Sequence, residues 1–181
     1  MTYILLADGF EEIEALCPLD LLIRAGIEAK TVSIGKNRLV TGTHGIRIEA
    51  DMLMSEIPSD VLPEMVVLPG GMPGASNLDN SDAVKNMVKE AYLRDAYVAA
   101  ICAAPFILGK MGILKGKKAI CYPGFEDALE GAEISQDKVV RDKNVITAAG
   151  MGVAAEFGYE LILALKGKET ADTVMKRILW G

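Results

Sequence analysis

Cys102 is the residue whose position in this sequence most clearly suggests chemistry. It follows a short apolar run at 97–101 that is typical of a buried strand, and it precedes residues suited to a first helical turn, Ala103, Ala104 and Pro105. A strand-to-helix corner exposes a side chain and points the first helical N–H groups at it. A thiol there is expected to ionise more easily than free cysteine, with its pKa of about 8.5. The plain alternative is a small buried hydrophobic residue.

A second candidate, Glu14, lies in the first turns of a helix predicted over 10–25. Its neighbours Glu11 and Glu12 are sufficiently explained by the helix dipole, which favours acids at this end. Glu14 lies closer to the face predicted to pack on the sheet. A carboxyl group drawn into the interior has a raised pKa and can donate a hydrogen bond. The alternative is an ordinary surface acid.

Gly70 and Gly71 form a third feature, directly after a predicted strand at 64–69. Paired glycines at this place let backbone N–H groups approach an oxyanion, although they also suit a simple tight connection. The only histidine, His44, lies in the turn of a hairpin predicted over 38–51, where an exposed polar role is the ordinary interpretation.

The elements that must position these residues alternate along the chain. We predict strands over 2–7, 27–34, 64–69, 97–101, 117–122, 138–141 and 144–147, and helices over 10–25, 82–94, 153–165 and 168–179. The apolar face of the first helix is assigned to Ile13, Leu16, Leu19, Leu22 and Ile23, and Pro18 should kink or restart this helix. The order of elements predicts an open parallel sheet with helices on both faces. Ligand sites of such sheets lie at the carboxyl ends of the strands, where Cys102, Gly70 and Glu14 would meet.

Composition narrows the class of protein. The chain has 181 residues, 51% of them hydrophobic, which suits one domain over 1–181. A net charge of −6 argues against a nucleic-acid partner, and the sequence contains no apolar run of membrane-spanning length. Cys17, Cys102 and Cys121 are odd in number and contain no CxxC motif, which indicates reduced thiols and a cytoplasmic location. One histidine and no thiol cluster indicate that the chain has no metal site.

Five motifs together resemble the ThiJ/PfpI family, in the branch of the Parkinsonism-associated protein deglycase. They are G-F-E-E-I-E-A at 9–15, P-L-D at 18–20, V-V-L-P-G-G at 66–71, A-I-C-A-A-P at 100–105 and T-A-A-G-M-G at 147–152. The resemblance runs over nearly the whole chain. It implies a flavodoxin-like three-layer α/β sandwich of the class I glutamine amidotransferase type, without a cofactor and usually a homodimer.

The resemblance also implies roles for individual residues. Cys102 matches the family's nucleophilic, oxidisable cysteine, Glu14 matches its protonated glutamate partner, and Gly71 and Ala103 match its oxyanion-type backbone donors. The implied function is a deglycase or glyoxalase acting on methylglyoxal-like reactive carbonyls or their adducts, in carbonyl and oxidative stress defence. The alternative is a redox sensor or redox-activated chaperone with an oxidisable Cys102. A cysteine peptidase is the least favoured reading.

Two departures from the family pattern concern histidine. Hydrolases of the family usually carry histidine directly after the cysteine, where this chain has Ala103. Members of the deglycase branch often carry histidine before a proline on the following strand, where this chain has Tyr122. Tyr122 and His44 are therefore possible accessory residues, with His44 arriving from elsewhere in the fold or from a partner subunit. Otherwise Cys102 and Glu14 alone must provide the chemistry.

Overall fold

The main sheet has seven strands in the order β10-β11-β7-β6-β1-β2-β5. The computed structural model describes residues 1–58 and 60–180. Its sheet strands are β1 (Thr2–Leu6), β2 (Ala29–Ser33), β5 (Met52–Leu53), β6 (Met65–Leu68), β7 (Tyr97–Ile101), β10 (Val139–Asp142) and β11 (Val145–Ala148). Neighbouring strands are parallel except for the antiparallel pair β10 and β11. The predicted, mostly parallel sheet is confirmed.

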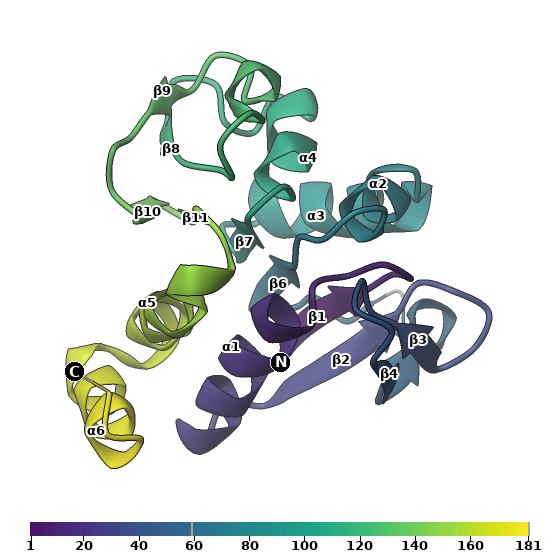
Figure 1. Ribbon diagram of the computed structural model, residues 1–181, viewed down its shortest axis with the longest axis horizontal. Helices are drawn as coiled ribbons and strands as arrows, with labels where there is room; N and C mark the ends of the chain where they lie inside the picture. The colour runs from purple at the N-terminus through teal and green to yellow at the C-terminus, as the bar shows by residue number, and fades with distance from the viewer. Residues whose placement is uncertain (59, 181) are drawn as a thin grey trace.

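Helices cover both faces of this sheet. One face carries α1 (Glu12–Arg24), α5 (Ala154–Lys166) and α6 (Lys168–Arg177), and the other carries α2 (Gly74–Asp79), α3 (Asp82–Leu93) and α4 (Pro105–Lys110) (Figure 1). The central strands are apolar throughout because successive side chains point to opposite layers. In β1, Ile4 and Leu6 pack in the layer of α1, whereas Tyr3 and Leu5 pack in the layer of α3. The result is the flavodoxin-like three-layer α/β sandwich.

The smaller elements flank the sheet. They are the hairpin β3 (Leu39–Thr41) and β4 (Arg47–Glu49), the parallel pair β8 (Lys118–Ala119) and β9 (Glu133–Ile134), and the 3₁₀ turns η1 (Met54–Glu56), η2 (Glu126–Ala128) and η3 (Met151–Val153). The strand predicted over 117–122 is only two residues long, so Cys121 does not lie within it. Helix α2 begins at the end of the predicted loop and covers residues for which no element was predicted. Within residues 1–58 and 60–180, every helix is too short or too polar to cross a membrane.

Helix α1 faces the core differently from the prediction. Ile13 and Ile23 are 48% and 56% exposed, and the buried residues are Glu12, Glu14, Ala15, Pro18, Leu21 and Leu22. The helix also runs unbroken through Pro18. Close packing against α5 explains this face, since a Cβ added at Gly158 would lie 2.5 Å from Leu21 Cδ1. The small side chain of Ala15 and the ring of Pro18 allow the two helices to approach closely. The predicted face was chosen from large apolar residues and therefore did not include them.

Glu12 does more than interact with the helix dipole. Its buried carboxylate accepts hydrogen bonds from the backbone N–H of His44 (2.9 Å) and from the His44 ring Nδ1 (2.8 Å). Gly42, in the same hairpin turn, leaves room for this carboxylate, because any Cβ there would overlap it. The first turn of α1 therefore holds the turn of the β3–β4 hairpin, and the prediction that Glu12 has only a dipole role is wrong.

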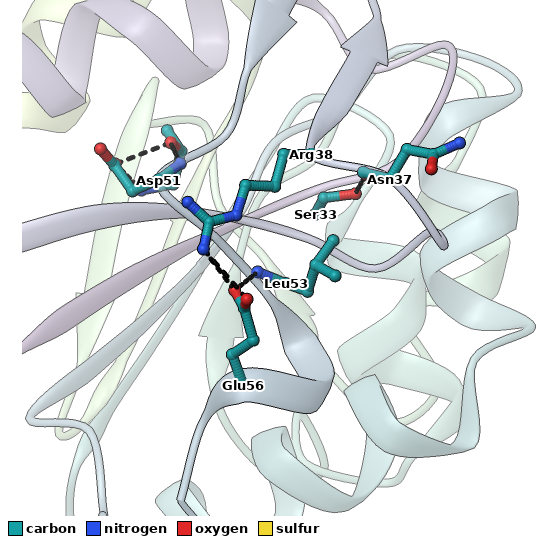
Figure 2. Close-up of polar contacts among 7 residues, drawn as sticks. Ser33, Asn37, Arg38, Asp51, Leu53 and Glu56 are labelled. Carbon is teal, nitrogen blue, oxygen red and sulfur yellow. Dashed lines mark hydrogen bonds and ion pairs between the residues drawn. The ribbon is translucent and has the colours of Figure 1, made fainter.

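The opposite end of the hairpin is fixed by a second set of polar contacts (Figure 2). The Arg38 guanidinium donates to both carboxylate oxygens of Glu56, at 2.9 and 3.0 Å, and Glu56 also accepts from the Leu53 N–H at 2.7 Å. Beside them, the Ser33 hydroxyl donates to the Asn37 carbonyl at 2.6 Å. The hairpin is thus anchored at both ends, which keeps it beside the first turn of α1.

Replacing Glu12 with Gln should destabilise the protein most strongly between about pH 5 and 6.5. The hydrogen bond from Glu12 raises the pKa of His44, so this stabilisation is present below about pH 6.5 and is lost as pH rises through the raised value. Burial acts to raise the pKa of Glu12, but hydrogen bonds from His44 and from the backbone N–H groups of Glu12 and Ile46 outweigh it and lower the value. Stabilisation by Glu12 is therefore present above about pH 4.5 and is lost as pH falls through the lowered value.

Urea unfolding at several pH values measures this effect. Glu49→Gln, which removes the same charge from an exposed position of β4, is the matched control and should change little at any pH. A stability loss in Glu12→Gln that is the same at every pH would contradict the ion-pair interpretation.

Candidate active site

Cys102 lies in the corner that follows β7 and has a left-handed backbone, with φ of 64°. This conformation is uncommon for residues other than glycine and is held by contacts on both sides. The Cys102 N–H donates to the Ala148 carbonyl at the end of β11 (2.9 Å), and its carbonyl accepts from the Tyr122 N–H (2.7 Å). The corner turns the side chain away from the strand, as the sequence predicted.

The donors beside the sulfur are local backbone groups rather than a long helix. Helix α4 starts only at Pro105 and has six residues, so Ala103 and Ala104 form a turn before it. The N–H groups of Ala103 and Gly71 face the Cys102 sulfur, where they lower its pKa. The structure thus brings together both backbone donors that the sequence singled out, but the helix-dipole argument does not apply.

Glu14 reaches the same place from the first turn of α1 and is fully buried. Its Oε2 accepts a hydrogen bond from the Gly70 N–H at 2.9 Å. The Cys102 thiol and the Met151 N–H face the same carboxyl group. Its Oε1 is buried and has no hydrogen-bond partner of ordinary geometry within the part of the chain that the structure describes. A buried oxygen in this state favours the protonated carboxyl, which can donate.

Burial raises the pKa of Glu14 to about 7. The hydrogen bond with Cys102 opposes this shift, the charge of Glu11 adds to it, and the N–H groups of Gly70 and Met151 oppose it. Near neutral pH both the protonated and the ionised form of this carboxyl group are therefore populated. An acid poised in this way can both give and take a proton at physiological pH.

The prediction of a thiol that ionises easily is wrong for Cys102 as long as Glu14 is ionised. Burial raises the pKa of Cys102, and the Glu14 carboxylate raises it further, to about 12, against the N–H groups of Ala103 and Gly71. Protonation of Glu14 removes its charge and turns it into a donor to the sulfur. Two groups that interact this strongly lose protons as a pair. When the pair holds one proton, that proton can lie on Glu14, which leaves Cys102 as a thiolate beside a neutral carboxyl group.

The other two thiols lack this partner. Burial raises the pKa of the half-buried Cys17 on α1. Burial and then the charge of Glu126 raise the pKa of the buried Cys121 to about 11. The feature that distinguishes Cys102 is therefore the buried carboxyl group of Glu14 that faces its sulfur, and not a low pKa.

The two accessory candidates have different positions. The His44 ring bonds to Glu12, which is two positions from Glu14 in α1 and therefore on another side of the helix. The fold of one chain thus places His44 against Glu12 and not against the thiol. Tyr122 does lie at the site. Its ring and the Cys102 sulfur lie 3.3 and 4.0 Å, respectively, from the position of a Cβ added at Gly150.

One group of side chains has the types and spacing of metal ligands. The ligand atoms of Glu11, Glu12 and His44 lie within 4.8 Å of one another. Glu11 is already the N-cap of α1, accepting from the Glu14 N–H at 2.7 Å, and Glu12 is bonded to His44. These contacts give the group a structural role in joining α1 to the hairpin.

Gly70, which the sequence singled out together with Gly71, lies between Glu14 and Cys102. A Cβ added there would lie 2.6 Å from Glu14 Oε2 and 2.7 Å from Cys102 Cβ. Glycine at this position therefore allows the carboxyl group and the thiol to meet, and its N–H also binds Glu14. The sequence indicated the pair of glycines as backbone donors, but the contact of Gly70 with both Glu14 and Cys102 depends on the tertiary structure.

Comparison with known proteins identifies the family of this chain. A model of the DJ-1/PfpI family matches residues 2–164. This chain belongs to the DJ-1/PfpI family. The family contains both enzymes and proteins without enzymatic activity, and its DJ-1 members are commonly homodimers.

Individual relatives cover nearly all of the chain. Protein DJ-1 homolog A of Arabidopsis thaliana is 38% identical over 96% of this chain, and the Parkinson disease protein 7 homolog of Danio rerio is 34% identical over 94% of this chain and 92% of its own length. The chain spans less than half the length of the Arabidopsis relative, 45%. The solved structure of an oxidized Toxoplasma gondii DJ-1 has a TM-score of 0.95 at 32% identity, over 99% of this chain and 98% of that one.

Replacing Gly70 with Ala should separate Glu14 from Cys102, because the added Cβ overlaps both. We expect a stability loss of about 1–3 kcal/mol from overpacking and slower alkylation of Cys102 by iodoacetamide at neutral pH. Gly152→Ala is the matched control, since a Cβ at Gly152 meets no atom of the described residues within 4 Å. Equal alkylation rates in the two variants would show that the close approach at Gly70 is not needed.

Variants of Glu14 test whether a neutral donor stabilises the thiolate. Both variants remove the carboxylate charge that raises the pKa of Cys102, so both should lower the apparent pKa of this thiol below that of the parent protein. Gln keeps an N–H donor whereas Leu has none, so the apparent pKa should be about one to two units higher in Glu14→Leu than in Glu14→Gln, the value of a hydrogen bond to a charged group. The rate of Cys102 alkylation against pH measures both. Identical profiles for the Gln and Leu variants would contradict the donor role.

Proposed function

We propose that this chain is a cofactor-free enzyme of the glyoxalase and deglycase type, which acts on methylglyoxal-like reactive carbonyls and their adducts. The observation that carries the proposal is the contact of a fully buried Glu14, with a pKa of about 7, with the half-buried thiol of Cys102. A nucleophile, a proton carrier and two N–H donors, from Gly71 and Ala103, are the parts that addition to a carbonyl group requires.

The first step joins Cys102 to the aldehyde carbon of methylglyoxal. The thiolate forms the S–C bond, and the electron pair of the C=O bond moves to oxygen. N–H groups of Gly71 and Ala103 stabilise this oxygen, and protonated Glu14 supplies the proton that completes the hemithioacetal. Glu14 is now a carboxylate beside the former aldehyde carbon.

The later steps need only water as a co-reactant. The Glu14 carboxylate removes the proton from the former aldehyde carbon, and the neighbouring ketone becomes an enediol. Return of a proton to the ketone carbon gives a thioester of lactate with Cys102. Water then breaks the S–C bond, releasing lactate and restoring the thiol. The aldehyde carbon is oxidised and the ketone carbon reduced within one molecule, so the step requires no external oxidant.

Redox sensing is the second candidate, and the N–H groups around the sulfur favour it. A thiolate that attacks hydrogen peroxide forms an S–O bond, breaks the O–O bond and releases water, and a second peroxide gives the sulfinate. Gly71 and Ala103 could then hold the new oxygens, and protonated Glu14 could donate to one of them. A role as a redox-activated chaperone would follow from the same oxidation. A peptidase is less favoured, because within the described residues the sole imidazole is bonded to Glu12.

We further propose that the protein is a cytoplasmic homodimer with one domain over 1–181. Apolar side chains on the outer face of α1 support the dimer, since Ile13 and Ile23 are large and exposed in the single chain. A homodimer would cover such a face with the same face of a second copy.

A lactate assay on the purified protein tests the reaction. Methylglyoxal should yield lactate, Cys102→Ala should abolish the yield, and Cys17→Ala should leave it unchanged. Glu14→Gln should reduce the rate by about 10²–10⁴-fold, as is typical of a lost acid–base group. Because a phenol is a poorer proton acceptor than an imidazole, Tyr122→His should raise the rate. Loss of turnover in a folded His44→Ala variant would overturn the assignment of Glu14 as the proton carrier.

A further inference from the structure

Three residues that adjoin the site of Cys102 and Glu14 have exposed apolar side chains, namely Met72, Tyr122 and Met151. The last two are 51% and 53% exposed. Met72 follows Gly71, whose N–H faces the sulfur, and the N–H of Met151 faces Glu14. Large apolar side chains that gather in the open around a reactive group mark a surface for an apolar ligand group. We name these three residues the apolar rim.

Two members of the apolar rim are held in place. The Tyr122 backbone is tied to the nucleophile, because its N–H donates to the Cys102 carbonyl at 2.7 Å. The Met72 sulfur accepts from the Ser76 hydroxyl at 3.7 Å, and the Met72 carbonyl accepts from the Thr43 hydroxyl at 3.2 Å. A rim that is positioned before a ligand arrives loses less side-chain entropy on binding.

Gly150 lies against both the Tyr122 ring and the thiol of Cys102. The position of a Cβ on Gly150 is 3.3 Å from ring atom Cδ2, 3.8 Å from Cε2 and 4.0 Å from the Cys102 sulfur. The Tyr122 ring therefore lies close enough to the sulfur to meet a substituent of a carbonyl compound that is bonded there. An exposed aromatic ring suits an aromatic or bulky apolar substituent better than a methyl group.

The charges near the site restrict the class of ligand further. The charged side chains that act on the pKa values of Cys102 and Glu14 are Glu14 itself and Glu11, and both are acidic. The chain as a whole carries a net charge of −6. An anionic substrate would be repelled as it approached, so a neutral one is favoured.

We propose that Tyr122 and Met151 select neutral α-oxoaldehydes whose ketone carbon bears an aromatic or bulky apolar group. This inference rests on the proposed function and names its substrate class. Phenylglyoxal would react by the same steps as methylglyoxal. The thiolate adds to the aldehyde carbon, Glu14 transfers the protons, and hydrolysis by one water molecule releases mandelate. Tyr122 and Met151 touch the substituent and take no part in proton transfer.

Turnover gives the first test. The ratio of kcat/KM for phenylglyoxal to that for methylglyoxal should fall about tenfold in Tyr122→Ala and should be retained in Tyr122→Phe, which keeps the ring. Leu93→Ala, an exposed apolar residue at the end of α3, is the control and should change neither value. Mandelate is measured rather than loss of phenylglyoxal, because phenylglyoxal also reacts with arginine. A ratio unaffected by Tyr122→Ala would overturn the inference.

A second test does not depend on turnover. Iodoacetamide and its N-phenyl derivative alkylate thiolates by the same displacement of iodide, and mass spectrometry follows the product at Cys102. For Cys102, the alkylation rate with the N-phenyl compound is divided by the rate with iodoacetamide, and this ratio is then divided by the same ratio measured for glutathione. The resulting value should be several-fold above one in the parent protein and should approach one in Tyr122→Ala. An elevated ratio without lactate or mandelate would reject the proposed enzyme but support the apolar rim. A ratio of one in the parent protein would reject the rim, whether or not lactate forms.

Discussion

The contact between the buried carboxyl group of Glu14 and the thiol of Cys102 is the interaction on which the rest of the site depends. Glu14 comes from the first turn of α1, and Cys102 from the corner after β7, so the sheet has to bring two distant segments to one edge. Gly70 stands between them without a side chain and gives its N–H to the carboxylate at 2.9 Å. The contact between Glu12 and the β3–β4 hairpin holds the start of α1 in place, and this fixes the position of Glu14 relative to Cys102.

Burial has two consequences that work together in this pair. It raises the pKa values of both groups, so each alone would remain neutral near pH 7, but the hydrogen bond between them allows one ionisation to be shared. A thiolate beside a neutral acid is a nucleophile with its proton donor already in place. Both the reaction with aldehydes and the reaction with peroxide start from this state, and they differ in which electrophile reaches the sulfur first. The apolar rim favours carbonyl compounds with apolar substituents.

Much of the fold and of the site could be predicted from the sequence, because apolar strands, glycine stops and the strand–turn corner are local signals. Cys102, Glu14, Gly71 and Ala103 do come together. The buried face of α1 was predicted wrongly, since close packing at Gly158 selects Pro18 and small residues over Ile13 and Ile23. The pKa of Cys102 was also predicted wrongly, because desolvation and a neighbouring carboxylate depend on the tertiary structure and leave no trace in local spacing.

The most direct test of the shared proton is a pH titration by nuclear magnetic resonance, with ¹³C labels at the Glu14 carboxyl carbon and the Cys102 Cβ. If one proton is shared, part of the shift of both carbons occurs at the same pH, and the Glu14 carbon titrates completely in one step only in a Cys102→Ala variant. The account is contradicted if Glu14 titrates completely near pH 7 in the parent protein while the Cys102 carbon stays at its thiol position until about pH 12.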